Sequence, residues 1–495
     1  MSNNGNAGRT LVAGIDSSTQ STKVVVCDAA TGEVVAVGRA PHPDVTEISA
    51  DLWWDALGQA SGQLPEDVRR SVRAVAVGGQ QHGMVTVDAD GGLVRDALLW
   101  NDTRSAQAAT ELTTELGGPA AWADAAGSVP VASITATKLR WLAEAEPDNA
   151  QRTARVMLPH DWLTWRLLGG GPGAADVAAT TDRGDASGTG YWSPATGQYR
   201  EDLLRLALRR PRGGLPELPA VMGPGQSPGL TAAGTPLGEG LVLGAGTGDN
   251  MGAALGLGVR PGDVVVSLGT SGVVSAWHDK PSGDPSGFVA GFADATGHFL
   301  PLVCTLNAAR VLSATARMLG TDMDELTALA LAAEPGAGGL SLLPYLDGER
   351  TPNLPQAAGS LHGLRRGNMT NVNLARAAVE GMLCGLAEGI DALRSQDISI
   401  GRVLLIGGAA RNPAVQAAAP IVFGAPVTVP ADAEYVALGV ARQAAWALSG
   451  QPEPPQWSAP VDTVLDGPAD PGAGQGIRAA YAAARDGLYP GSATG

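Results

Sequence analysis

The sequence predicts an α/β protein made of two lobes with a cleft between them. Short β-branched runs alternate with longer runs of helical apolar spacing, which is typical of α/β architecture. One pattern occurs twice: an apolar strand, a Gly/Ser/Thr turn and a second apolar strand, at 11–26 (LVAGIDSSTQSTKVVV) and at 263–277 (DVVVSLGTSGVVSAW). With 495 residues in the chain, each half is long enough to bury its own core.

In the first half, three strands joined by tight turns predict a meander, formed by LVAGID, KVVVCD and EVVAVGRA. Two further apolar runs, VRAVAVGG at 72–79 and DALLW at 96–100, predict strands that are each followed by polar residues. Because α/β sheets place their sites at strand ends, we expect these polar residues to converge on one cleft.

A segment rich in glycine and proline, 225–242, predicts the boundary between the halves. We expect the strand LVLGAG, which follows it, to open the second half. Helical apolar spacing predicts helices at 374–394 and 437–450, and a last short helix near 476–488 after an irregular stretch. The predicted regions are a first domain at 1–240, a second domain at 241–450 and a tail at 451–495.

The composition excludes several classes of protein. A net charge of −16 argues against binding to nucleic acid or to an anionic membrane. No uncharged apolar run reaches the ~18 residues of a membrane span, and the polar start MSNNGNAGRT is unlike a secretory signal. Cys27, Cys304 and Cys384 lie far apart in apolar stretches, which predicts buried thiols in a reducing cytoplasm.

The two Gly/Ser/Thr turns present N–H groups and hydroxyls that could hold a phosphate chain between the lobes. Asp16 ends the strand before the first turn and could support Mg²⁺ directly or through water. Either turn alone could be a plain hairpin, and Lys23 could be a solvated hairpin lysine, but two such turns favour the phosphate interpretation. The candidate residues are Ser18, Thr19, Gln20, Ser21, Lys23, Gly269, Thr270, Ser271 and Gly272.

A carboxylate follows a glycine-rich strand end in GAGTGDNMGAALG at 244–256. Asp249 could be the N-cap of a helix that begins there, or a general base that accepts a proton from an attacking hydroxyl. The strand VLLI meets Gly407 and Gly408 in a similar way. Close backbone approach at such a glycine pair suits a nucleotide base or an α-phosphate, although many glycine pairs bind nothing.

The stretches GGQQHG and LLWNDTR supply hydrogen-bond donors and acceptors together with a flat indole face. That mixture suits a polyol, whereas a histidine in a turn is often merely exposed. The candidate side chains are Gln81, His82, Trp100, Asn101, Asp102 and Arg104.

From about residue 10 to 450, the chain resembles the FGGY family of carbohydrate kinases, within the actin-like ATPase superfamily. The resemblance is carried, in order, by GIDSSTQSTK, GGQQHG, LLWND, MLPHDWL, DASGTGYW, GDNMGAALG, SLGTSG, LPYLDGERTP and GGAARN. The stretch GSLHGLRRGNMTNVNLARAAVE at 359–380 also fits the family's C-terminal signature.

The resemblance implies a role for each matching residue. Asp249 matches the catalytic base, Asp16 the Mg²⁺-associated carboxylate, and Gln81 and His82 the sugar-binding pair, with Asn250 nearby. The segments Ser18 to Ser21 and Thr270 to Gly272 match the two phosphate turns, and Gly407, Gly408 and Asn412 match the adenosine region.

The resemblance also implies two ribonuclease-H-like (actin-like ATPase) domains that close on a sugar, and often a homodimer. The expected reaction is Mg-ATP-dependent phosphorylation of D-xylulose, with a ribulose, another ketose or a polyol left open. Glycerol is disfavoured, because QQHG lacks the Arg-Glu pair of glycerol kinases. A non-catalytic actin-like nucleotide-binding module is a remote alternative, against which Asp16 and Asp249 together argue.

Overall fold

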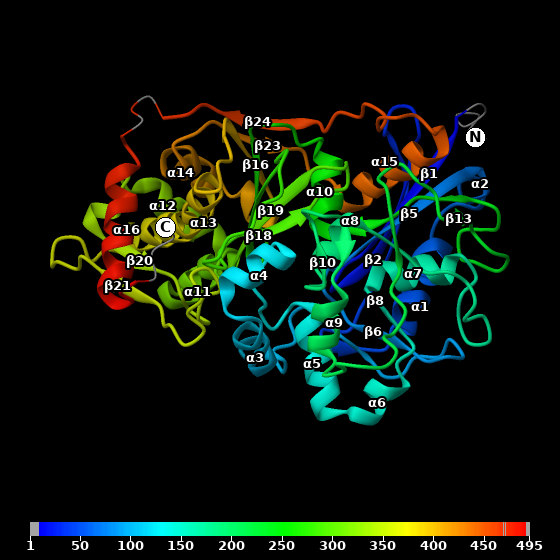
Figure 1. Ribbon diagram of the computed structural model, residues 1–495. Helices are drawn as coiled ribbons and strands as arrows, with labels where there is room; N and C mark the ends of the chain where they lie inside the picture. Colours follow the sequence, from blue (N-terminus) through cyan, green and yellow to red (C-terminus); the bar gives the residue numbers. More distant parts are fainter. Residues whose placement is uncertain (1–8, 469, 471, 492–495) are drawn as a thin grey trace.

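The computed structural model describes residues 9–468, 470 and 472–491 and contains two seven-stranded mixed sheets, each flanked by helices (Figure 1). This arrangement confirms the predicted α/β class. Among the residues that the model describes, no helix has the length and apolarity needed to cross a membrane.

The first sheet has the strand order β13-β14-β5-β1-β2-β3, and β15 also pairs with β5. The predicted meander is confirmed, because β2 pairs antiparallel with both β1 and β3. In this sheet the central strand β5 lies between β1 and β14 and is parallel to both. Both faces of β5 are therefore buried, which explains why its sequence is almost entirely apolar. The strands are β1 (Leu11–Ser17), β2 (Ser21–Asp28), β3 (Val34–Pro41), β5 (Val72–Gly79), β13 (Gly229–Leu230), β14 (Val242–Leu243) and β15 (Thr247–Gly248).

The strand expected to open the second half belongs to the first sheet. Val242 and Leu243 of β14 pair with Ala74 and Val75 of β5. That expectation is therefore wrong, and a domain boundary at residue 240 divides the first sheet. A two-residue apolar strand fits either sheet equally well by sequence, so only the pairing partner decides where it lies.

The second sheet has the order β18-β19-β17-β16-β22-β23-β24. The predicted hairpin is confirmed, since β16 and β17 pair antiparallel across the turn at 269–271. The tail is not wholly irregular before its last helix, because β24 pairs with β23 at the sheet edge. The strands are β16 (Asp263–Leu268), β17 (Gly272–Ala276), β18 (Ala290–Ala293), β19 (Phe299–Thr305), β22 (Arg402–Ile406), β23 (Val427–Pro430) and β24 (Val461–Leu465).

Five short strand pairs complete the β structure. The strand predicted at 96–100 is shorter than expected and belongs to one of these pairs, because only Ala97 and Leu98 form strand pairing with β4. The pairs are β4 (Glu47–Ile48) with β7 (Ala97–Leu98), β6 (Val85–Val87) with β8 (Arg155–Met157), β9 (Thr180–Asp182) with β12 (Ala220–Met222), β10 (Trp192–Ser193) with β11 (Gln198–Tyr199), and β20 (Ser341–Leu343) with β21 (Ser360–His362).

Helices cover both sheets, and those predicted at 374–394, 437–450 and 476–488 are confirmed as α13, α15 and α16. α13 begins where the Thr370 side chain accepts a hydrogen bond from the Asn373 N–H, a standard N-cap. The helices are α1 (Asp51–Gly62), α2 (Glu66–Ser71), α3 (Ala106–Leu116), α4 (Pro119–Ala126), α5 (Thr135–Ala145), α6 (Pro147–Arg152), α7 (Pro159–Leu167), α8 (Arg183–Ser187), α9 (Glu201–Ala207), α10 (Asp249–Leu257), α11 (Ala309–Leu319), α12 (Met323–Ala332), α13 (Asn371–Arg394), α14 (Pro413–Phe423), α15 (Tyr435–Ser449) and α16 (Gln475–Leu488).

Although α15 lies between β23 and β24 of the second sheet in the chain, it packs against β1 and β5 of the first sheet and against α10. Glycines allow this close approach. A Cβ added to Gly439 would lie 1.8 Å from the carbonyl oxygen of Gly252, and one added to Gly14 would lie 1.9 Å from that of Ala437. These backbone contacts fix α10, and with it Asp249 at its first position.

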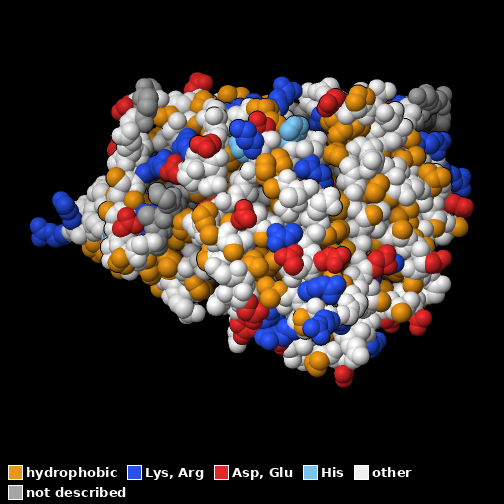
Figure 2. All heavy atoms as spheres, viewed as in Figure 1, with side chains coloured by type: hydrophobic (Ala, Val, Ile, Leu, Met, Phe, Trp, Pro, Cys, Tyr) orange, Lys and Arg blue, Asp and Glu red, His pale blue; other side chains and the backbone are white. Residues whose placement is uncertain are grey.

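Two expectations from composition concern the interior and the surface. Cys27 and Cys384 are buried as predicted, but Cys304 is only half-buried, so that part of the prediction is wrong. On the described face in Figure 2, acidic and basic side chains are interspersed. That face therefore carries no continuous area of a single charge sign.

Candidate active site

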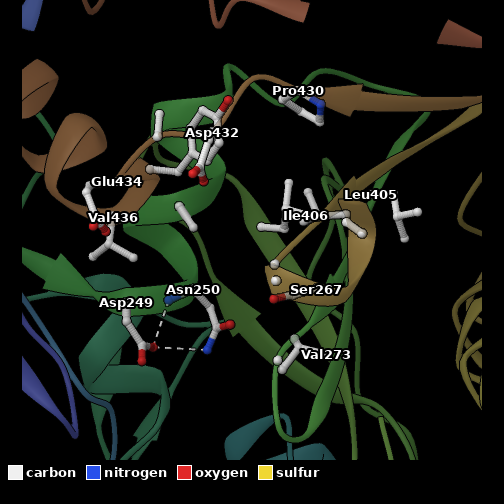
Figure 3. A pocket seen from close by; sticks show the side chains of 18 of the residues that line it. Asp249, Asn250, Ser267, Val273, Leu405, Ile406, Pro430, Asp432, Glu434 and Val436 are labelled. Atoms are coloured by element: carbon white, nitrogen blue, oxygen red, sulfur yellow. Dashed lines mark hydrogen bonds between the residues drawn. The ribbon is translucent and has the colours of Figure 1, made fainter. Parts of the chain in front are cut away.

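A cavity of about 530 Å³ lies between the two halves, where the first turn, α10, the second turn and the β22 strand end meet. In Figure 3, Asp249 and Asn250 lie at one end of it and Pro430 and Asp432 at the other, with Leu405 and Ile406 along one wall. Eight of the predicted site residues line it: Asp16, Ser18, Lys23, Asp249, Asn250, Gly269, Gly407 and Gly408.

Asp249 is the first residue of α10, and Gly248 occupies the N-cap position without a side-chain cap. The N-cap interpretation of Asp249 is therefore wrong. Its Oδ1 accepts hydrogen bonds from the Asn250 N–H at 2.8 Å and from Asn250 Nδ2 at 3.1 Å. Burial, and then the charge of Asp16, raises the pKa of Asp249 to about 7. This places a carboxylate of unusually high basicity on the cavity wall.

Asp16 is the second carboxylate of the cavity and is only 2% exposed. Burial raises its pKa to about 6, against the lowering effect of Lys23. The Lys23 ammonium lies 3.5 Å from Oδ2 of Asp16 and 2.6 Å from Glu434 Oε2. Oδ1 of Asp16 is buried and has no hydrogen-bond partner among the described residues. An unpaired, buried carboxylate oxygen at a cavity wall fits a hard cation or a water held by one.

Gln81 links the polar end of β5 to the Asp249 region. Its Oε1 accepts a hydrogen bond from Asn250 Nδ2 at 3.1 Å, although the two residues are far apart in sequence. Nε2 of Gln81 is buried and has no partner among the described residues. Asn250 therefore touches both the candidate sugar-binding stretch and the candidate base.

His82 is buried rather than exposed, and its backbone has a φ of 66°. Nδ1 lies 2.7 Å from the carbonyl oxygen of Gly188, so this nitrogen must be the donor. Burial, and then the charge of Lys138, lowers the pKa of His82 to about 3. The ring is therefore neutral, and Nε2 is left as an acceptor for a hydroxyl.

Residues of the LLWNDTR stretch make two kinds of contact, one with the first turn and one within their own loop. Trp100 Nε1 donates to Thr19 Oγ1 at 2.8 Å, which ties this stretch to the first turn. Asp102 accepts from Thr46 and from the Arg104 guanidinium, and although burial opposes the effect, these bonds lower its pKa. Asp102 thus stabilises the local loop. Asn101 Oδ1 is buried and unpaired among the described residues.

The remaining nucleotide-side candidates differ in their access to the cavity. Gly408 has open space where a Cβ would be, whereas Gly272 packs tightly, with an added Cβ only 2.6 Å from Leu386. The Asn412 side chain caps α14 and donates to Thr327 Oγ1, so it does not line the cavity. The turn residues that also lie outside its lining are Thr19, Gln20, Ser21, Thr270 and Ser271.

Sequence reasoning missed the segment at 429–436, which forms a whole side of the cavity. Glu434 pairs with Lys23, and Tyr435 and Val436 contribute apolar surface. Nothing in PADAEYV distinguishes it from an ordinary helix start, because its role depends on α15 crossing to the first half.

Taken together, the cavity joins an apolar compartment beside β22 to a polar end with the carboxylates of Asp16 and Asp249, hydroxyl-bearing turns and a neutral histidine nearby. Such a site can hold a nucleotide and align a hydroxyl for proton removal and phosphoryl transfer.

Models of two protein domains match the sequence: the N-terminal domain of the FGGY family of carbohydrate kinases over residues 11–256, and the C-terminal domain of that family over residues 264–448. A xylulose kinase of Streptomyces coelicolor is 48% identical over 466 residues, which is 92% of each chain. A xylulose kinase of Streptomyces rubiginosus is 48% identical over 89% of each chain.

Solved structures agree with this relationship. The crystal structure of xylulose kinase from Bifidobacterium adolescentis has a TM-score of 0.88 and 46% identity, and the match covers 96% of this chain and 99% of that one. A glycerol kinase from Plasmodium falciparum, at 18% identity and a TM-score of 0.84, shares the fold.

Proposed function

The chain belongs to the FGGY family of carbohydrate kinases, and we propose that it transfers the γ-phosphoryl group of ATP to D-xylulose, giving ADP and D-xylulose 5-phosphate. The observation that carries the proposal is the continuous path from Gln81 through Asn250 to Asp249 at a cavity that also contains Asp16. The near full-length similarity to two xylulose kinases supports D-xylulose over other sugars.

Asp249 acts as the general base. Its carboxylate orients the terminal hydroxyl of the sugar and accepts its proton as the oxygen bonds to phosphorus. The two hydrogen bonds from Asn250 go to Oδ1, so Oδ2 is left for the substrate. Because the transition state is loose, alignment and charge stabilisation contribute more than proton transfer alone.

The sugar lies against Gln81, Asn250 and His82. Gln81 offers its unpaired Nε2 as a donor, and neutral His82 offers Nε2 as an acceptor. The hydrogen bond from Trp100 to Thr19 ties the loop that carries Trp100 and Asn101 to the first turn. Asp102 holds the loop that carries them.

ATP occupies the cavity, with its base beside Ile406, Gly407 and Gly408 and its phosphates between the turns that contain Ser18 and Gly269. Asp16, through its unpaired oxygen, would hold Mg²⁺ directly or through water. When bound, Mg²⁺ neutralises charge on the phosphates. Lys23, fixed between Asp16 and Glu434, adds a positive charge at the same place.

The preferred sugar is tested by measuring sugar-dependent ADP release with D-xylulose, D-ribulose, xylitol and glycerol. We expect the highest kcat/KM for D-xylulose, by about tenfold or more, because buried polar groups that lose a hydroxyl partner are costly. A higher value for another sugar would reassign the enzyme within the family. ATP turnover that ignores every sugar would favour an actin-like ATPase, and binding of ATP without any turnover would favour a non-catalytic nucleotide-binding module.

The raised pKa of Asp249 predicts an acidic limb in the pH profile. The base works only when ionised, so kcat/KM for the sugar should fall about tenfold per pH unit below about pH 7 and level off above it. Burial also lowers the pKa of Lys138 to about 7, so a control is needed. In Asp249→Asn the residual activity should lose the limb; a limb that persists there would assign it to another group.

A further inference from the structure

A buried polar cluster lies beneath the residues that lead into Asp249. His160 in α7 and Asp185 in α8 are both fully buried, and His160 Nδ1 lies 2.5 Å from Asp185 Oδ2. Asp161 Oδ1 lies 3.3 Å from the same nitrogen. Burial alone would lower the pKa of His160, but the carboxylates of Asp161 and Asp185 raise it to about 10. The stretches MLPHDWL and DASGTGYW, which supply these residues, have no part in the mechanism above.

The cluster packs directly against the turn before α10. A Cβ added to Gly246 would lie 2.4 Å from Cδ2 of His160, and one added to Gly248 would lie 2.8 Å from Oδ1 of Asp185. The His160 ring and the Asp185 carboxylate therefore occupy the space that side chains at these two positions would fill.

The residue between the two glycines is also held. Thr247 Oγ1 donates to Asp182 Oδ2 at 2.7 Å, and Oδ1 of Asp182 accepts from the Asp185 N–H at 2.9 Å. Residues 246–248 thus contact His160 of α7, Asp182 at the N-cap of α8 and Asp185 of α8 in turn, immediately before Asp249.

Gln81 also packs against Gly248. The Cβ that Gly248 lacks would lie 2.7 Å from Gln81 Cγ as well as 2.8 Å from Asp185 Oδ1. Neither Oδ1 of Asp185 nor Nε2 of Gln81 has a hydrogen-bond partner among the described residues. Asp185 therefore borders both the strand end that carries the base and the side chain that faces the sugar.

We propose that Asp185, held by His160, is a positioning residue for Asp249 and Gln81. The inference rests on the proposed kinase function. Asp185 does not touch the substrate; it acts through Gly248. Without the His160–Asp185 bond the turn can relax, and a shift of about 1 Å in the base can cost about a hundredfold in rate.

The test is steady-state kinetics of the full-length chain with ATP and whichever sugar the wild type phosphorylates fastest. Asp185→Asn and His160→Leu should each lower kcat about tenfold to a hundredfold, while KM for ATP changes less than about twofold. His160→Asn, whose amide keeps a donor near the Nδ1 position, should recover most of the rate lost in His160→Leu.

Asp161→Asn is the matched control. Asp161 is equally buried and faces the same histidine, and no hydrogen bond links it to residues 246–248. Its kcat should fall less than about threefold. An unchanged kcat in Asp185→Asn, an equal loss in Asp161→Asn, or no rescue in His160→Asn would overturn the proposal. If Asp185→Asn does not fold, the two His160 variants decide, with melting temperatures to confirm folding. Absence of turnover with any sugar in the wild type would instead refute the proposed function.

Discussion

Asp249→Asn should lower kcat for sugar phosphorylation by about a thousandfold or more, because it removes the group that takes the hydroxyl proton while keeping the size of the side chain. The amide can still accept from the Asn250 N–H, so the start of α10 should remain in place. ATP binding, measured by calorimetry, should change little, since the apolar compartment beside Ile406 lies away from this carboxylate.

Asp263→Asn is the appropriate control for Asp249→Asn. Asp263 is also a buried carboxylate, but it begins β16, at the end of that strand away from the second turn and the cavity, and it pairs with Arg402. It should retain most of the wild-type kcat. Near-normal turnover in Asp249→Asn would contradict the assignment of the base, whatever the control shows.

Asp16→Asn should lower kcat by about a hundredfold and raise the Mg²⁺ concentration required for half-maximal rate, because it removes the unpaired carboxylate oxygen of the cavity. The loss should not reflect unfolding. The folded-state pKa of Asp16 is raised to about 6, so its ionised form opposes folding above that pH, and the melting temperature at pH 8 should not fall.

Glu434→Gln separates the effect of Asp16 from that of its neighbour. Glu434 holds the same lysine at 2.6 Å, so the variant weakens the Lys23 pairing but keeps the Asp16 carboxylate. A smaller loss of kcat and an unchanged Mg²⁺ requirement are expected. If Glu434→Gln matched Asp16→Asn in both measurements, the lysine rather than a metal ion would explain the role of Asp16.

The local elements of this protein follow from local signals. The meander, the hairpin at 263–276 and the long helix α13 were predictable, because alternation, turn residues and helical spacing act between near neighbours in the chain. The polar groups at the strand ends were predictable for the same reason, because Asp16, Gln81 and Asp249 each follow an apolar run closely in the sequence.

The sequence by itself thus determined the fold class, the family and the stretches that carry polar groups. Only the tertiary structure decided that β14 joins the first sheet, that α15 crosses back to fix α10, that Glu434 holds Lys23, and that His160 packs against Gly246 and Asp185 against Gly248. The physical reason is one of range. Propensity and periodicity report on residues within a few positions of one another, whereas these contacts join segments tens to hundreds of residues apart, through backbone fit and buried polar pairing that no single stretch encodes.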